Sequence, residues 1–230
     1  MKILKTMLLA AAATAAMGGS ALAADDDISL AFNLGAASDY MFRGVSQTNN
    51  GGQVYGGVDA TLYGIGYAGA WVSNVDFNNG TDLEYDLYAG VKPVLGPVNL
   101  DLGVIYYGYA NQPANSHEDY VEYKAAGSTA VGPATIGVAV FYSPEFFGKT
   151  GKATYYEVNG AMPVVDKVSV SGAIGHQEIE GPADYNTWNL GVGYALNDHV
   201  GFDLRYHDTD EHGFGDIYDA KIVVGVKASF

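Results

Sequence analysis

The C-terminal stretch from residue 217 to residue 230 reads IYDAKIVVGVKASF and alternates between two kinds of side chain. One set is apolar or aromatic and comprises Tyr218, Ala220, Ile222, Val224, Val226, Ala228 and Phe230. The other set is mostly polar or small and comprises Asp219, Lys221, Val223, Gly225, Lys227 and Ser229. Because successive side chains of a β-strand point to opposite faces, the stretch predicts a strand with a lipid-facing and a lumen-facing side, ending at Phe230.

The same alternation recurs along the chain. Twelve such segments begin near Ile28, Gln53, Gly66, Asp82, Val98, Glu118, Ala134, Ala153, Val168, Tyr185, His199 and Ile217. Their connections are alternately tight, as at Asn197-Asp198, and long and polar, as from Asp39 to Gly52. Outer-membrane barrels have short periplasmic turns and longer extracellular loops. The sequence therefore predicts an all-β fold, a transmembrane antiparallel β-barrel of about 12 strands with both termini on the periplasmic side.

A soluble β-sandwich or barrel also alternates, but its apolar face points inward. The membrane barrel is favoured because the second face is polar and rich in glycine, and because closure removes exposed strand edges. Aromatic residues also cluster near strand ends, as interface girdles require; they are Tyr40, Phe42, Phe77, Tyr142, Tyr156, Tyr206, Tyr218 and Phe230. In the segment that begins at Gly66 the two faces are not distinguished, since Ala70 and Val72 oppose Gly69 and Trp71.

The N-terminus has the features of a secretory signal peptide. Lys2 and Lys5 precede an apolar run from Met7 to Ala16, and Ala21-Leu22-Ala23 is a small-x-small cleavage site. We therefore expect a signal peptide over residues 1–23, a barrel domain over residues 24–230, and export to the bacterial outer membrane. A membrane anchor is the alternative for the first segment.

Composition and charge narrow the functional classes. The 230 residues include no cysteine, which excludes disulfide scaffolds and thiolate metal sites. Hydrophobic residues make up 48% of the chain, yet the mean hydropathy is only +0.03, because apolar and polar residues are finely mixed. Without residues 1–23, nine basic residues oppose 26 acidic ones, a net charge of −17. Nucleic acid is a poor partner for such a chain.

Residues 36–48, AASDYMFRGVSQT, resemble the opening motif of the TorF family of proteobacterial porins. The similarity continues in residues 56–59, GGVD, and in residues 83–90, LEYDLYAG. This resemblance implies an outer-membrane barrel with a transport role but no particular substrate. The alternating string that ends at Phe230 resembles the C-terminal signal by which such barrels are recognised for assembly. The implied partners are outer-membrane lipid, lipopolysaccharide and the barrel assembly machinery.

The inward face of the predicted barrel suggests a pore. Its lining candidates are Arg43, Asp59, Asp86, Asp101, Glu122, Lys124, Asp203 and Arg205. The wider set of inward acids outnumbers the inward cations, which favours cations or neutral solutes over anions. Inward glycines such as Gly103, Gly175 and Gly191 would leave room for a narrow pore. The alternative is that the charges pair across strands and fill the interior. Arg43 either lies at a constriction or helps the motif to close the first strand.

No covalent chemistry or cofactor is required by the sequence. A lipid hydrolase would need a serine beside a histidine, but Ser169 and Ser171 have the opposite parity to His176. Residues 207–212, HDTDEH, hold several oxygen ligands, although an exposed acidic loop is usually only solvated. We therefore expect a porin-like channel for passive diffusion of small hydrophilic solutes or ions, and not an enzyme. The alternatives are a closed structural or adhesive barrel and a lipid hydrolase.

Overall fold

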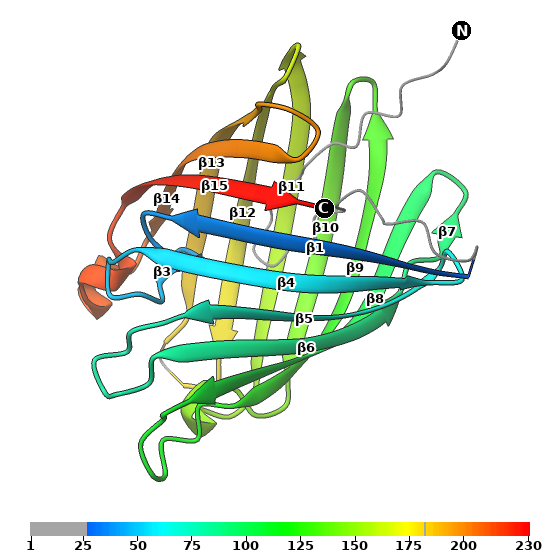
Figure 1. Cartoon of the computed structure of the whole chain (residues 1–230). Helices are drawn as coiled ribbons and strands as arrows, with labels where there is room; N and C mark the ends of the chain where they lie inside the picture. Colours follow the sequence, from blue (N-terminus) through cyan, green and yellow to red (C-terminus); the bar gives the residue numbers. More distant parts are fainter. Residues whose placement is uncertain (1–26, 182) are drawn as a thin grey trace, which may run out of the picture.

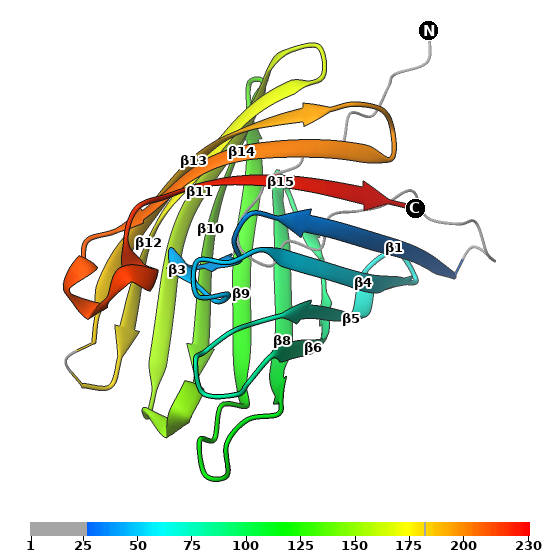
Figure 2. The ribbon, with the colours of Figure 1, turned by 60° about the vertical axis from the view of Figure 1, so that its left-hand side comes forward.

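A computed structural model of the chain describes residues 27–181 and 183–230; the predicted signal peptide lies outside the described residues. Twelve long antiparallel strands form a closed barrel (Figures 1 and 2). They are β1 (Ile28–Ala37), β4 (Gln53–Leu62), β5 (Gly66–Asn74), β6 (Leu83–Val91), β8 (Val98–Ala110), β9 (Tyr120–Val131), β10 (Ala134–Ser143), β11 (Ala153–Val165), β12 (Val168–Ile179), β13 (Tyr185–Ala195), β14 (Val200–Thr209) and β15 (Lys221–Ser229). The predicted fold class is confirmed.

Shorter elements lie in the connections. They are β2 (Met41–Phe42), β3 (Val45–Ser46), β7 (Val94–Leu95) and three 3-10 turns, η1 (Phe147–Lys149), η2 (His212–Phe214) and η3 (Asp216–Tyr218). Tight turns connect the long strands at one end of the barrel, here named the short-turn end. Longer segments connect them at the other, the long-loop end. No helix among the described residues is long and apolar enough to cross a membrane.

The first and last long strands close the barrel. Strand β1 pairs with β15 from Asn33 opposite Ser229 to Ala37 opposite Gly225. Beyond this ladder, Phe32 and Phe230 exchange two backbone hydrogen bonds of 2.9 Å, so the final residue is part of the seam. Every other long strand pairs with the long strand that precedes it and the one that follows it in sequence. Local hairpins thus build the whole wall except at this one junction.

The outer surface of the barrel is apolar. Side chains that point outward include Leu34, Ile174 and Ile222, whose exposed fractions are 58%, 64% and 70%. A soluble β-barrel would bury this face. An apolar outer band of this kind is the surface that a transmembrane barrel presents to lipid. Of the aromatic residues expected near strand ends, four are exposed on the outside: Tyr142, Tyr156, Tyr206 and Phe230.

Three other aromatic predictions of that kind are wrong. Tyr40, Phe42 and Phe77 pack inside the barrel or beneath its loops and not at a lipid interface, because the connections that carry them fold inward. Tyr218 is also not on the last strand. Residues Asp216–Tyr218 form a 3-10 turn after Gly215, whose φ of +127° redirects the chain, and β15 begins only at Lys221.

The sequence did not distinguish the two faces of β5, and the structure shows which side chains point inward and which point outward. Tyr67 donates a hydrogen bond over the inner face of β6 to Asp101 on β8, and Trp71 packs against the interior aromatic cluster. Val72 is 41% exposed on the outside. The last strand begins at Lys221, four residues after the predicted Ile217, and the other predicted strand starts agree with the structure to within two residues, as at Tyr120, where the prediction was Glu118.

Candidate functional site

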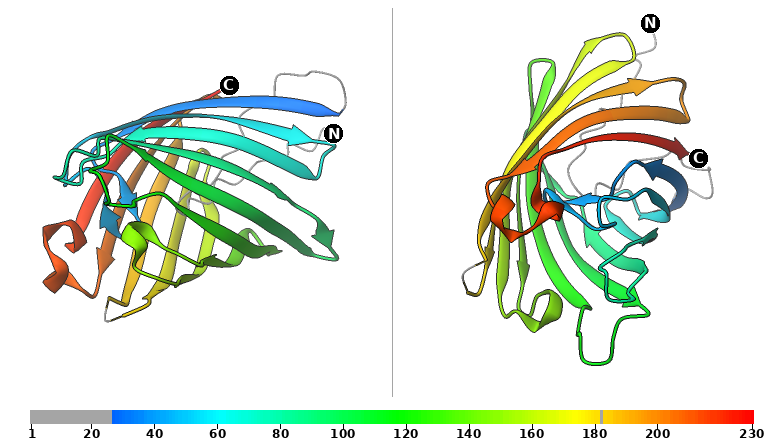
Figure 3. Two further views of the ribbon diagram at one scale, coloured as in Figure 1. Left: turned by 90° about the horizontal axis from the view of Figure 1, so that it is seen from below. Right: turned by 90° about the vertical axis from the view of Figure 1, so that its left-hand side faces the viewer.

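The connection between β1 and β4 folds into the barrel as a small hairpin (Figure 3). In this hairpin Met41 pairs with Ser46 and Phe42 with Val45, which leaves Arg43 and Gly44 as a two-residue turn. Their φ angles are +49° and +83°. Two positive φ angles are the mark of the type I′ turn, which suits the twist of a β-hairpin. The turn therefore holds the Arg43 side chain at the tip of the hairpin.

Asp39 fixes the base of this hairpin. Its Oδ1 accepts hydrogen bonds from Ser46 Oγ at 2.6 Å and Thr48 Oγ1 at 2.9 Å. At the tip, a side chain at Gly44 would overlap the Thr187 hydroxyl on β13. The hairpin is thus bonded internally at one end and packed closely against the barrel wall at the other.

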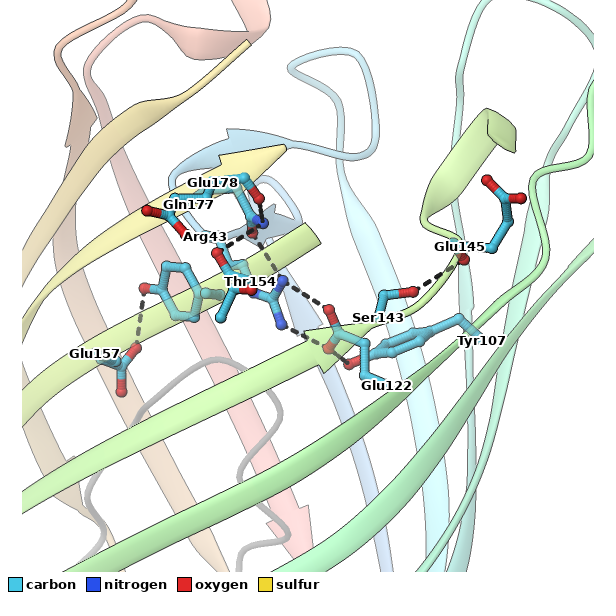
Figure 4. A network of polar contacts seen from close by, with 10 residues as sticks. Arg43, Tyr107, Glu122, Ser143, Glu145, Thr154, Glu157, Gln177 and Glu178 are labelled. Atoms are coloured by element: carbon cyan, nitrogen blue, oxygen red, sulfur yellow. Dashed lines mark hydrogen bonds and ion pairs between the residues drawn. The ribbon is translucent and has the colours of Figure 1, made fainter. Parts of the chain in front are cut away.

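Arg43 reaches across the lumen to the wall opposite β1 (Figure 4). Its Nη1 and Nη2 donate to the two carboxylate oxygens of Glu122 on β9 at 2.8 and 2.6 Å. Nη1 also donates to Gln177 Oε1 on β12 at 2.8 Å. The Arg43 and Glu122 side chains are only 3% and 1% exposed. This is a buried, bidentate ion pair that ties the first connection to the far wall.

Aromatic rings surround the guanidinium. Its carbon lies 4.6, 5.1 and 4.4 Å from the ring centres of Phe42, Phe141 and Tyr155. Burial alone would lower the pKa of Arg43, but the Glu122 charge and its hydrogen bonds outweigh that effect, and the pKa is raised. The arginine is therefore held in its charged form.

The interior at the level of Arg43 and toward the long loops contains a buried cluster of mostly aromatic side chains. The buried cluster comprises Tyr40, Val75, Ile105, Tyr107, Tyr109, Tyr120, Ala139, Phe141 and Tyr155. Tyr107 and Tyr120 stack with their ring centres 4.5 Å apart, and Phe146 packs on Tyr120 at 4.8 Å. An interior of this kind is a packed core.

The interior on the short-turn side contains a cavity of about 1110 Å³. Residues of two tight turns, 163–168 and 197–201, line its outer end. Asp39, Tyr40 and Arg43 of the hairpin line its inner end. Among the described residues, none from the five other long connections contributes to the lining. The cavity is thus a deep pocket that begins at the short turns and ends at the hairpin.

Most of the predicted pore-lining charges lie on this cavity, already paired. Lys124 Nζ donates to Asp101 Oδ2 at 2.8 Å, and Arg205 forms a two-point contact with Asp203 at 3.0 Å. Asp59 accepts a 2.7 Å hydrogen bond from Tyr88. The further predicted lining residues are Arg43 and Asp86, which line the cavity, and Glu122, which is buried beneath Arg43.

The expectation that lumenal glycines leave open space is wrong at several positions. A Cβ at Gly175 would overlap the Tyr155 ring, and one at Gly191 would lie 2.6 Å from Arg205 Cζ. At Gly103 the Tyr67 hydroxyl occupies the corresponding space. Each glycine lets a large side chain from the same or the next-but-one strand lie against the wall, and Tyr67 on β5 reaches Gly103 over β6. These glycines therefore permit filling of the interior.

Two contributors to the site were not predicted from the sequence, namely Gln177 and the tyrosines around Arg43. Gln177 is on the inward face of β12, as the strand alternation predicts, but an uncharged side chain gives no signal of a polar contact with a loop. Tyr107 and Tyr120 also alternate inward. Neither position has a charge that would mark it as a partner for a loop arginine.

The histidines of the two alternative chemical sites have other partners among the described residues. His176 bonds through Nδ1 to Asn186 Oδ1 at 2.9 Å, whereas Ser171 faces inward and bonds to Arg205. In the acidic loop, His212 Nε2 lies 2.8 Å from Asp208 Oδ1. No group of three or more potential metal ligands occurs among the residues that the structure describes.

Residues 21–230 match a family model described as "Bacterial protein of unknown function (Gcw_chp)". The chain belongs to this family. No curated protein matches the sequence. Membership assigns almost the whole chain to one family, but the family description names no activity.

The fold is similar to that of solved outer-membrane channels. The KdgM porin superposes with a TM-score of 0.63 at 8% identity, covering 87% of this chain and 99% of that one. The NanC porin gives 0.57 at 8% identity, with 87% and 97% covered. The COG4313 outer membrane channel from Pseudomonas putida F1 gives 0.54 at 10% identity, with 93% and 96% covered. At these identities the likeness concerns the fold alone.

Proposed function

We propose that this protein is a porin-like channel of the outer membrane, of the TorF type, for passive diffusion of small hydrophilic solutes or ions. The observation that carries the proposal is the cavity of about 1110 Å³ inside a barrel whose outer face is apolar. Water and solutes can occupy such a lumen while lipid surrounds the wall. The short turns then face the periplasm and the long loops face the cell exterior.

In this proposal the hairpin at Arg43 is the narrowest point. The cavity ends there, and aromatic side chains fill the interior beyond it. Passage therefore requires the hairpin and the rings that contact it to move aside. The channel is expected to open rarely, or to conduct weakly, unless the contact between Arg43 and Glu122 is broken.

The charges of the lining favour cations and neutral solutes. Eight acidic and six basic residues border the cavity, counting those in the turns. One similar porin was solved with oligogalacturonate, an acidic oligosaccharide. The acidic excess argues against solutes of that charge for this chain. We also propose contact with lipopolysaccharide at the long loops and recognition of Phe230 by the barrel assembly machinery.

Single-channel recording in planar bilayers tests the channel. We expect small or infrequent current steps from the unmodified protein and larger or longer steps from Arg43→Ala, because that change frees the hairpin. The control is Lys152→Ala, which removes one positive charge from a long loop outside the cavity. Its currents should match those of the unmodified protein.

A cation/anion permeability ratio above one is expected in a salt gradient. Silence of both the unmodified protein and Arg43→Ala at all voltages would contradict the channel. That result would favour the alternative of a closed structural or adhesive barrel, for which the aromatic packing at the long-loop end is the supporting observation.

A further inference from the structure

The cavity wall formed by β4, β5 and β6 carries four aromatic residues, each directly opposite a glycine on the neighbouring strand. The pairs are Tyr55 with Gly35, Trp71 with Gly57, Tyr67 with Gly90 and Tyr88 with Gly69. All four aromatic residues line the cavity and are half-buried. A glycine leaves the space over its own strand empty, so the ring opposite it can lie across that strand.

These rings lie along the wall instead of pointing across the lumen. Tyr88 Oη on β6 donates a 2.7 Å hydrogen bond to Asp59 on β4, two strands away, so the Tyr88 ring crosses β5. A Cβ at Gly69 of β5 would overlap this ring, as one at Gly35 of β1 would overlap the Tyr55 ring. Rings held in this way turn one face toward the strands and the other toward the cavity.

Three of these rings, Tyr55, Trp71 and Tyr88, form the surface that we name the aromatic wall. Tyr55 and Trp71 are neighbours, with ring centres 5.9 Å apart and planes tilted by 35°. The fourth ring, Tyr67, is left out because Lys92 Nζ lies over it, 4.6 Å from its centre. The aromatic wall is therefore an apolar surface that borders the cavity.

Charge-balanced carboxylates lie on both sides of the aromatic wall. On β8, next to β6, Asp101 accepts a 2.8 Å hydrogen bond from Lys124. On β14, beyond β1 and β15, Asp203 is bonded at 3.0 Å to Arg205, and the Asp203 side chain is 38% exposed. A carboxylate has about four lone-pair sites, so each of these groups can accept further hydrogen bonds. The two groups thus offer acceptors whose charge is already balanced.

We propose that the aromatic wall binds an uncharged sugar of one or two pyranose rings. The C–H groups on the flat side of a pyranose ring are attracted to the negative face of an aromatic ring. The hydroxyl groups radiate from the edge of the sugar ring, so they can donate to Asp101 or Asp203 at the sides of the wall. A sugar acid would instead bring a carboxylate close to these carboxylates. Such a site rests on the proposed function and names the class of solute that the lumen would take.

The test uses the refolded full-length protein in micelles of lauryldimethylamine oxide, a detergent without a sugar headgroup, and cellobiose as the probe. The cavity of about 1110 Å³ has room for both rings of cellobiose. Isothermal titration calorimetry should detect its binding. Sorbitol, which has hydroxyl groups but no ring, and nicotinamide, a flat uncharged ring without hydroxyl groups, should each bind at least about tenfold more weakly.

The position of the bound sugar can be tested by fluorescence. Trp71 and Trp188 are the only tryptophans in the chain, and Trp188 faces outward. In a Trp188→Phe background, the fluorescence of Trp71 therefore reports on the aromatic wall directly. Cellobiose should change this emission with the same affinity that calorimetry gives.

A matched set of variants tests the stacking. Tyr88→Leu should weaken cellobiose binding by about fivefold or more, since it removes one aromatic face. Tyr88→Phe keeps the ring and should bind cellobiose within about twofold of the unmodified protein. Tyr156→Leu, the same change on the outer face of β11, should leave binding unchanged.

Equal affinities for cellobiose and sorbitol, tighter binding of nicotinamide, no response to cellobiose, or undiminished binding by Tyr88→Leu would overturn the proposal. The comparison of ligands needs no variant, so it decides the question even if Tyr88→Leu does not fold. Cellobiose binding without bilayer current would overturn the channel but leave the site standing. Bilayer current through a protein that does not bind cellobiose would overturn the site but leave the channel standing.

Discussion

Two ion pairs on adjacent levels of the lumen lie in different surroundings. On the side of the long loops, Arg43 and Glu122 are 3% and 1% exposed and lie among aromatic rings. Nearer the short turns, Lys124 and Asp101 are 19% and 21% exposed and line the cavity. A buried pair is costly to break, whereas a solvated pair contributes little to stability. The first pair therefore holds the hairpin in place, while the second leaves its charges available to solutes.

The largest expected effect comes from breaking the buried pair. Arg43→Ala should lower the free energy of unfolding by about 3–5 kcal/mol, because Glu122 would remain buried without its counter-charge. Urea unfolding in micelles, followed by tryptophan fluorescence, measures this. The double variant Arg43→Met with Glu122→Leu removes both charges and should recover most of the loss. A loss no greater than that of an exposed pair would show that the two ion pairs do not differ as described.

The next effect concerns how closely the wall is packed. Gly175→Ala should lower the free energy of unfolding by about 1–3 kcal/mol, since the new methyl group would overlap the Tyr155 ring. Gly225→Ala is the matched control, because its Cβ would meet its nearest neighbours at an ordinary 3.7 Å. The same unfolding experiment compares the two. Equal losses would contradict the view that the glycine beneath Tyr155 serves packing.

A smaller effect is expected from the solvated pair. Lys124→Ala should change the free energy of unfolding by less than about 1 kcal/mol, because water screens this contact. It should nevertheless raise the cation/anion permeability ratio, since a positive charge leaves the cavity. Reversal potentials in a salt gradient measure the ratio. An unchanged permeability ratio would show that the charge of Lys124 does not influence the ions that pass through the lumen.

The smallest effect is a titration at the long loops. His212 is exposed, and its hydrogen bond with Asp208 raises its pKa above the usual 6.5. This contact is fully present below about pH 6.5 and is lost as the pH rises through the raised pKa of His212. In Asp208→Asn, the pKa measured by NMR of the histidine ring protons should fall toward 6.5. Equal titration curves would refute the contact.

The number of strands and the face on which each strand side chain lies could be predicted from the sequence, because both follow from local alternation. Each strand needs only its own period of two and a turn signal on either side. The position of Arg43 inside the barrel could not be predicted with the same certainty. It depends on a connection of fifteen residues, 38–52, turning inward and on partners from strands more than seventy residues away.

The wrong predictions have a common physical cause. Tyr40, Phe42 and Phe77 lie beside strand ends, where an aromatic residue can face lipid or fold over the rim, and local pattern does not distinguish these outcomes. Glycines on the inward face likewise allow either an empty space or a neighbouring ring. Only the spatial positions of Tyr155, Tyr67 and Arg205 decide between the two.

The seam between β1 and β15 has a consequence for the order of folding. Every other pair of neighbouring long strands is joined by one connection, so pairing them closes only a short loop of chain. Phe32 and Phe230 are separated by almost the whole domain, so their two hydrogen bonds close the longest loop in the barrel unless the intervening hairpins have already brought the ends together. Loop-closure entropy makes contacts between such distant residues slow to form. Until they form, the sheet has two unpaired edges, and the chain at that stage is a nascent ribbon open to strand exchange or aggregation.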